Sequence, residues 1–220
     1  QHYKLAYCAL LLRFVPPFAS LPGLAGNIAG SAPDFRLAGW NSSGEICVTC
    51  HTPHNSDTTV ADAPLWNHDV TVQTYAMYAS PTFDATADPQ PTGTSKLCLS
   101  CHDGSVALDS FGNANGGTFI QDVNANAAVG LDGLNNDHPI SFTFDTALVA
   151  LDGALHDPST AVTIGAGADI KVGTIASTML IAGQVQCASC HDVHNKFTDG
   201  PYLLRVNNNG SGLCLTCHNK

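Results

Sequence analysis

Positive charge is scarce in this sequence. Lysine and arginine together number 8, against 18 aspartates and glutamates, which gives a net charge of −10 at pH 7. The few basic residues form no cluster that could neutralise a row of phosphates. The composition therefore disfavours nucleic acid and anionic membrane surfaces as partners.

Long periodic runs of apolar residues are also missing. Apolar residues make up 44% of the chain, which is near the average, but the large aliphatic and aromatic ones are scattered. Beyond the first 30 residues, nothing approaches the length of a transmembrane helix, so we expect no membrane span. A chain of 220 residues with so little core material needs something else to fill its interior.

Cysteine, in contrast, is abundant and ordered. Eight of the nine cysteines fall in four copies of the pattern Cys-x-x-Cys-His, whereas a shuffled chain of this composition should contain about 0.02 copies. The ninth, Cys8, stands alone, and we interpret it as a small buried apolar residue. The four copies pair Cys47 with Cys50, Cys98 with Cys101, Cys187 with Cys190, and Cys214 with Cys217, followed by His51, His102, His191 and His218.

This pattern is the attachment signature of c-type haem. Two thiols three residues apart lie on one helical turn and can bond both vinyl groups of a porphyrin, while the next histidine binds the iron. Four covalently bound c-type haems would also supply the missing core. The alternatives fit less well: zinc needs no histidine after every pair, a redox dithiol needs one pair rather than four, and disulfides do not predict the histidines.

The four motifs form an internal repeat. Ile46–Asn55 followed by Ser95–Asp103 resembles Gln186–Asn195 followed by Ser211–Asn219, so a paired-haem unit has been duplicated. The sequence predicts four segments: an apolar N-terminal arm or retained leader at 1–35, the first paired-haem unit at 36–112, a Gly/Asn/Asp-rich insertion carrying a distal histidine at 113–186, and the second unit at 187–220.

Little regular structure is expected. Alternating patterns at Ser141–Phe144 and Ala161–Ile164 predict short β-ribbons, and Gly116-Gly117, Asp132-Gly133 and Asp152-Gly153 predict turns. We expect a mostly irregular multihaem c-type cytochrome with a one-turn helix at each motif and a few β-hairpins.

Each haem iron takes two axial ligands, and histidines outside the motifs are the candidates for the second one. His54 and His194 occupy equivalent positions of the repeat, each three residues beyond a motif histidine, so each should reach a neighbouring haem rather than its own. His138 is held extended by the following proline, and His68 follows a tryptophan suited to packing on a porphyrin. These four are the predicted distal ligands, with His2 and His156 as weaker candidates and Met77 and Met179 as possible substitutes.

The repeat resembles the doubled-motif multihaem cytochromes. The residues that carry this are Cys50-His51-Thr52-Pro53-His54-Asn55, Ala63–His68, Ser95–Gly104 and Asn136–Ile140. Among these cytochromes the chain is most similar to extracellular tetrahaem cytochromes that polymerise into conductive filaments. The resemblance implies four bis-His haems in a stack and subunits joined head to tail, with one haem taking a histidine from the adjacent subunit. Ser31–Phe35 lacks the histidine that this family carries there, so His2 or another distal histidine is the candidate for that contact.

The preferred hypothesis is therefore a filament subunit that transfers electrons and is not an enzyme, because bis-His iron has no open site. Its partners would be further copies of itself, and redox partner cytochromes or extracellular acceptors. Attachment of haem through thioethers implies an extracellular or periplasmic location. The alternatives are a monomeric periplasmic tetrahaem shuttle and a multihaem reductase with one open haem.

Overall fold

The computed structural model describes residues 28–61 and 63–219. Most of the predicted N-terminal arm, including His2 and Cys8, lies outside the described residues. Within the part described, no helix is both long and apolar enough to cross a membrane.

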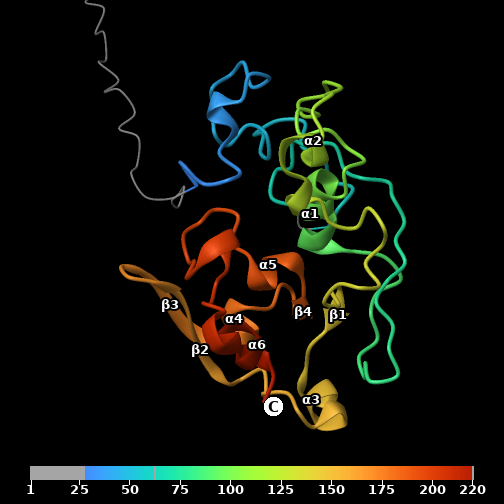
Figure 1. Ribbon diagram of the computed structural model, residues 1–220, viewed down its shortest axis with the longest axis vertical. Coiled ribbons are helices and arrows are strands. Elements are labelled where there is room, and N and C mark those ends of the chain that lie inside the picture. The colour runs from blue at the N-terminus through green and yellow to red at the C-terminus, as the bar shows by residue number, and fades with distance from the viewer. Residues whose placement is uncertain (1–27, 62, 220) are drawn as a thin grey trace, which may run out of the picture.

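The described residues contain short helices, two small sheets and much coil, in agreement with the expected fold class (Figure 1). The longest helix, α1, has ten residues. The α-helices are α1 (Gly93–His102), α2 (Ile120–Asn124), α3 (Thr146–Asp152), α4 (Ile175–Thr178), α5 (Cys187–Cys190) and α6 (Gly212–Cys217); the 3-10 helices are η1 (Phe35–Leu37), η2 (Ala125–Ala127), η3 (Pro201–Leu203) and η4 (Asn209–Ser211).

Both sheets are antiparallel pairs that involve the predicted ribbons. β2 (Ala161–Ala166) and β3 (Asp169–Thr174) form a hairpin in which Val162 lies opposite Gly173. β1 (Phe142–Thr143) pairs instead with the distant β4 (Gln184–Val185), so it is not part of a hairpin. This second pairing places the end of the insertion, which lies directly before the third motif, against the middle of the insertion.

The Asp152-Gly153 pair ends a helix rather than forming a hairpin turn. Asp145 caps the start of α3 by accepting a hydrogen bond from the Leu148 amide at 2.9 Å. Gly153 adopts the left-handed conformation, with φ of 72°, and its amide closes the helix on the Val149 carbonyl. Glycine serves here because a side chain would strain that conformation.

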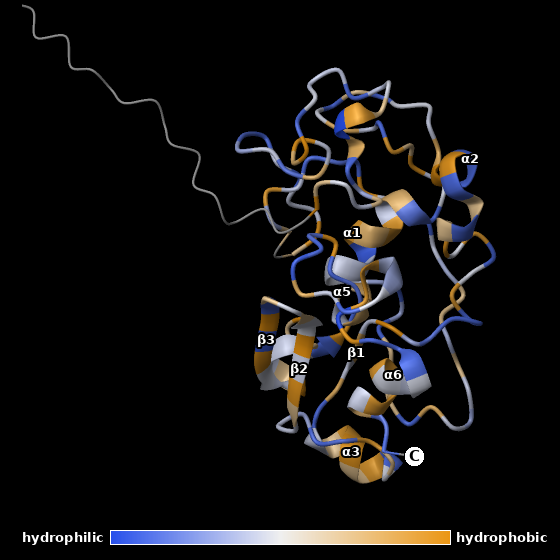
Figure 2. Ribbon diagram, turned by 60° about the vertical axis from the view of Figure 1, so that its left-hand side comes forward, coloured by the Kyte–Doolittle hydropathy of each residue, from blue (hydrophilic) through white to orange (hydrophobic). Residues whose placement is uncertain are grey.

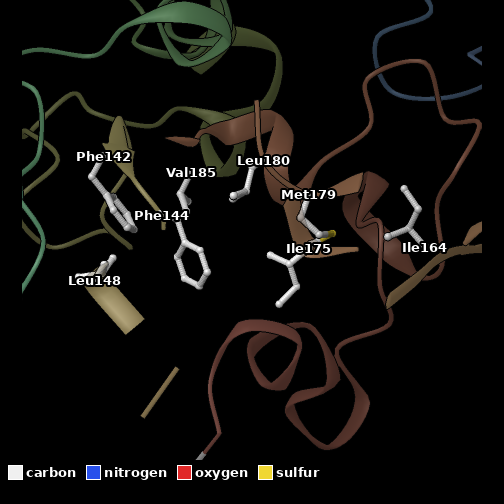
Figure 3. Close-up of a cluster of buried hydrophobic side chains, with 8 residues drawn as sticks. All are labelled: Phe142, Phe144, Leu148, Ile164, Ile175, Met179, Leu180 and Val185. Carbon is white, nitrogen blue, oxygen red and sulfur yellow. The ribbon is translucent and has the colours of Figure 1, made fainter. Parts of the chain in front are cut away.

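One hydrophobic cluster of eight buried residues lies within the insertion, and partly buried residues of the second unit, including Phe197 and Leu213, pack against it (Figure 3). Ile164 of β2 and Ile175 of α4 are fully buried in it. Met179, a possible iron ligand on sequence grounds, also packs in this cluster and is 2% exposed. A smaller cluster of Tyr75, Leu99 and Leu134 lies beside α1. Elsewhere, hydrophobic stretches on short elements are separated by hydrophilic loops (Figure 2).

The two predicted paired-haem units meet at α1 and α5 (Figure 1). The Cys187 amide donates to Ser95 Oγ at 3.0 Å, and the Ser95 amide donates to Gln186 Oε1 at 3.3 Å. Ser95 and Gln186 are almost completely buried. This contact, which we call the junction, places the second and third motifs next to each other.

Candidate functional site

Each motif cysteine pair lies on a single backbone turn. The amides of His51, His191 and His218 donate to the carbonyl of the first cysteine of their own motif, at 2.8, 3.1 and 2.9 Å. The second, third and fourth motifs belong to α1, α5 and α6, while the first is a hydrogen-bonded turn outside any assigned helix. Such a turn brings residues three apart onto one side, as attachment of one group through both thiols requires.

Three motif histidines are held in the same way. Nδ1 of His51 lies 2.6 Å from the Pro64 carbonyl, Nδ1 of His102 lies 2.7 Å from the Ala127 carbonyl, and Nδ1 of His191 lies 2.8 Å from the Tyr202 carbonyl. A carbonyl oxygen can only accept, so Nδ1 carries the proton. In the neutral ring, Nε2 then keeps its lone pair for a metal, which is the usual arrangement for a ligating histidine.

A returning segment fixes the first motif, and we call residues 64–67 the first strap. Its Leu65 carbonyl accepts from the Thr52 amide at 2.8 Å, and the Asn67 amide donates to the Cys50 carbonyl at 3.0 Å. The Asn67 side-chain amide also donates to the Val48 carbonyl. Leu65 has a positive φ of 54°, which turns the strap toward the motif.

The third motif has a second strap, residues 202–205, with the same contacts. The Leu203 carbonyl accepts from the Asp192 amide at 2.8 Å, and the Arg205 amide donates to the Cys190 carbonyl at 2.8 Å. Arg205 Nε donates to the Ala188 carbonyl, also at 2.8 Å. Leu203 has a φ of 60°, so the straps correspond position by position.

Sequence reasoning missed both straps. Trp66-Asn67 and Leu204-Arg205 share no residue type, and the common contacts are made mostly by backbone atoms. The recurrence of motif and strap shows that the structural repeat extends beyond the residues that are similar in sequence.

Two predicted distal histidines lie opposite motif histidines. The ring centres of His51 and His194 are 6.1 Å apart with an interplanar angle of 11°, and those of His138 and His218 are 6.5 Å apart at 77°. Two imidazoles that bind one metal from opposite sides, through bonds of about 2.0 Å, have ring centres about 6 Å apart. Both pairs fit this spacing, and either angle is compatible because each ring can rotate about its metal–nitrogen axis.

The other two predicted distal histidines are placed differently. His68 is buried, with Nδ1 2.8 Å from the Asp69 carbonyl and Nε2 2.9 Å from the Ala107 carbonyl. Its Nε2 is also 3.5 Å from Cys101 Sγ, so this ring lies at the second motif. His54 is exposed on the loop after the first motif. Their roles as ligands stay predictions.

The first motif and the first strap each contain a buried polar atom without a hydrogen-bond partner in the described structure, namely Thr49 Oγ1 and Trp66 Nε1. The Trp66 ring lies edge-on to His51, with ring centres 6.4 Å apart. A buried indole N–H without an acceptor is unfavourable, and a carboxylate of a bound group would satisfy it. A porphyrin, which carries such carboxylates, therefore fits this site.

Burial and contacts between motifs shift the pKa of several motif thiols. Burial raises the pKa of Cys50, Cys190 and Cys217 to about 11. At the junction, a hydrogen bond between the Cys98 and Cys187 thiols raises the pKa of Cys98 and lowers that of Cys187. Among residues 28–61 and 63–219, no group of three or more histidine, cysteine or acidic side chains is arranged to hold an ion directly.

The comparison with protein families agrees with this geometry. Residues 180–220 match the family described as the doubled CXXCH motif, which covers the third and fourth motifs. This motif indicates a multihaem electron-transfer cytochrome with covalently bound c-type haem. No curated protein matches the chain.

If haem binds as this motif indicates, the cysteines would supply the thioether bonds. His51, His102 and His191, whose Nδ1 atoms are anchored on backbone carbonyls, would present Nε2 to iron. The haems would supply one-electron redox chemistry, and hydrogen bonds, burial and charge in the surrounding chain would adjust their reduction potentials.

Proposed function

We propose that this protein carries four bis-His c-type haems and conducts electrons along them as a subunit of an extracellular filament. The observation that carries the bis-His proposal is the spacing of the two imidazole pairs, at 6.1 and 6.5 Å. In this assignment, His194 completes the haem of the first motif, and His138 completes the haem of the fourth. His54 and His68 remain for the third and second motifs.

The ligand assignment accounts for the connections between the units. His194 belongs to the second unit and lies against His51 of the first, while His138 of the insertion lies against His218 at the end of the second. The junction adds direct contact between the second and third motifs. Sites connected in this way would form a continuous series across the subunit, as electron conduction needs.

Saturated iron also supports a role other than catalysis at haem. When an imidazole occupies each side of the metal, no coordination position is left for a substrate. The chain supplies ten histidines for the eight positions that four bis-His haems require. We therefore propose that the protein is not an enzyme.

The filament proposal rests on the sequence resemblance and on composition. With 220 residues for four haems, about 55 residues cover each one, which favours close packing of haems and exposure of the terminal ones. An exposed haem at each end could continue the series into the next subunit. Thioether attachment supports a location outside the cytoplasm, and a filament requires it to be extracellular.

Three measurements on the natively purified holoprotein test the proposal. Intact mass should correspond to four haems per chain, and the oxidised absorption spectrum should be entirely low-spin. Negative-stain images should show fibres. Fewer haems, or high-spin iron with substrate turnover, would overturn the bis-His conductor in favour of a reductase. Isolated particles at all concentrations would overturn the filament in favour of a monomeric periplasmic shuttle.

A further inference from the structure

The two straps differ in charge at one equivalent position. Asn67 in the first strap and Arg205 in the second both donate from the main chain to the second cysteine of their motif. Both side chains also donate to the carbonyl of the residue after the first cysteine. The duplicated scaffold therefore presents a neutral amide at the first motif and a guanidinium at the third.

Arg205 acts directly on the third attachment site. Its Nε is fixed 2.8 Å from the Ala188 carbonyl, inside the Cys-x-x-Cys turn. The Arg205 amide also donates to the Cys190 carbonyl at 2.8 Å, so two contacts hold this residue against the third motif. Arg205 is one of only eight basic residues in the chain, so a fixed cation at this place is a distinctive feature.

The second attachment site has the opposite charge. Asp103, directly after His102, is 4% exposed, and hydroxyl and amide groups surround its carboxylate. Oδ2 accepts from Thr71 Oγ1 at 2.5 Å and from the Tyr75 hydroxyl at 2.6 Å. Oδ1 accepts from the amide and hydroxyl of Ser105, both at 2.7 Å. These four donors stabilise the ionised form of the carboxylate.

No cation neutralises this carboxylate. The ion pairs formed within residues 28–61 and 63–219 are Arg36–Asp34 and the contact of His194 with Asp192, so Lys96 of α1 does not pair with Asp103. Asp103 directly follows His102 in the chain, so its negative charge lies beside the second attachment site.

The carboxylate of Asp192 follows the third motif but faces elsewhere. Its oxygens accept from the backbone amides of His194, Lys196 and Phe197, and Oδ1 lies 3.9 Å from His194 Nδ1. Its charge thus falls on the histidine that lies opposite His51. The third motif is therefore followed by a carboxylate and is also contacted by a guanidinium, whereas no described ion pair places a cation on Asp103 at the second motif.

Building on the proposed function, we infer that Asp103 and Arg205 set a difference in reduction potential across the junction. A negative charge stabilises ferric iron relative to ferrous iron and lowers the potential, and a positive charge does the reverse. Asp103 therefore holds the haem of the second motif at a lower potential, and Arg205 holds the haem of the third at a higher one. The two sites adjoin through Ser95 and the Cys98–Cys187 contact, so the difference falls within one transfer step and favours electron flow from the first unit to the second.

Redox titration of holoprotein variants tests this inference, with dithionite as reductant, ferricyanide as oxidant and haem absorbance as readout. Asp103→Asn should raise the reduction potential of one haem, which removes the most negative part of the titration curve. Arg205→Gln should lower the reduction potential of one haem, which removes the most positive part of the curve. Arg205→Lys keeps the charge and should retain the most positive part. Asp122→Asn and Lys171→Gln change exposed charges elsewhere and should leave the curve unchanged.

Mass and spin state, measured on every variant, separate failure of this inference from failure of the proposed function. Suppose that four haems are attached and low-spin, but Arg205→Gln has the same titration curve as Arg205→Lys, and Asp103→Asn the same curve as the exposed controls. The inference is then wrong, while the bis-His assignment stands. If Asp103→Asn does not mature, the two Arg205 variants alone decide, since Arg205 must raise one potential if the inference is correct.

Discussion

Replacing His194 with alanine tests the ligand that connects the two units. The His194 ring centre lies 6.1 Å from that of His51, and the rings are nearly parallel. The variant keeps every motif cysteine and histidine, so, if the chain carries four bis-His haems as proposed, all four should remain attached. One iron in four should then lose its second imidazole, converting about a quarter of the low-spin absorption to high-spin.

Binding of carbon monoxide to the reduced protein gives a count of open irons. The His194→Ala protein should bind about one equivalent per chain, against none for the unmodified protein. His156→Ala is the matched control, because His156 is half-buried and its backbone amide contact with the Cys217 carbonyl at 2.8 Å does not need the side chain. A His194→Ala protein that stays fully low-spin and binds no carbon monoxide would refute the assignment.

The remaining predictions concern the other ligand pair and the protein interior. His138→Ala should also expose one iron, and the double variant with His194→Ala should bind about two equivalents of carbon monoxide; a single equivalent would mean that both histidines serve one haem. Gln186→Ala should lower the free energy of unfolding by about 1–3 kcal/mol in guanidinium titrations of the holoprotein, because buried donors at the junction lose their acceptor; an unchanged midpoint contradicts this. Ile175→Ala should cost about 2–5 kcal/mol in the same assay, whereas Val72→Ala, at a side chain 90% exposed, should change little; equal effects would argue against the described core.

Covalent chemistry made much of the site predictable from sequence. A Cys-x-x-Cys-His pattern specifies a local turn, and the turns at Cys187 and Cys214 fold as that pattern requires. The stretches at 141–144 and 161–164 contain strands, because alternating polar and apolar residues place their side chains on opposite faces of a β-strand.

The sequence did not predict which distant segments pair with each other. Phe142 finds its partner at Val185, and a two-residue strand carries too little pattern to specify a distant neighbour. The Asp152-Gly153 pair suits a turn and a helix end equally, since both use left-handed glycine, and only the Asp145 cap distinguishes them. The straps bind mostly through backbone atoms, and Leu65 and Leu203 are the one residue type that they share at equivalent positions, so residue identity gives little sign of them. The pairing of His194 with His51 depends on how the two units meet, which no local pattern encodes.

The connection between His51 and His194 bears on how the protein is made. A polypeptide leaves the ribosome from its N-terminus, so the first motif emerges long before residue 194 has been synthesised. In the proposed ligation, a chain that ended before residue 194 would lack the second imidazole of the first haem. The spin state of that haem would therefore distinguish finished molecules from incomplete ones.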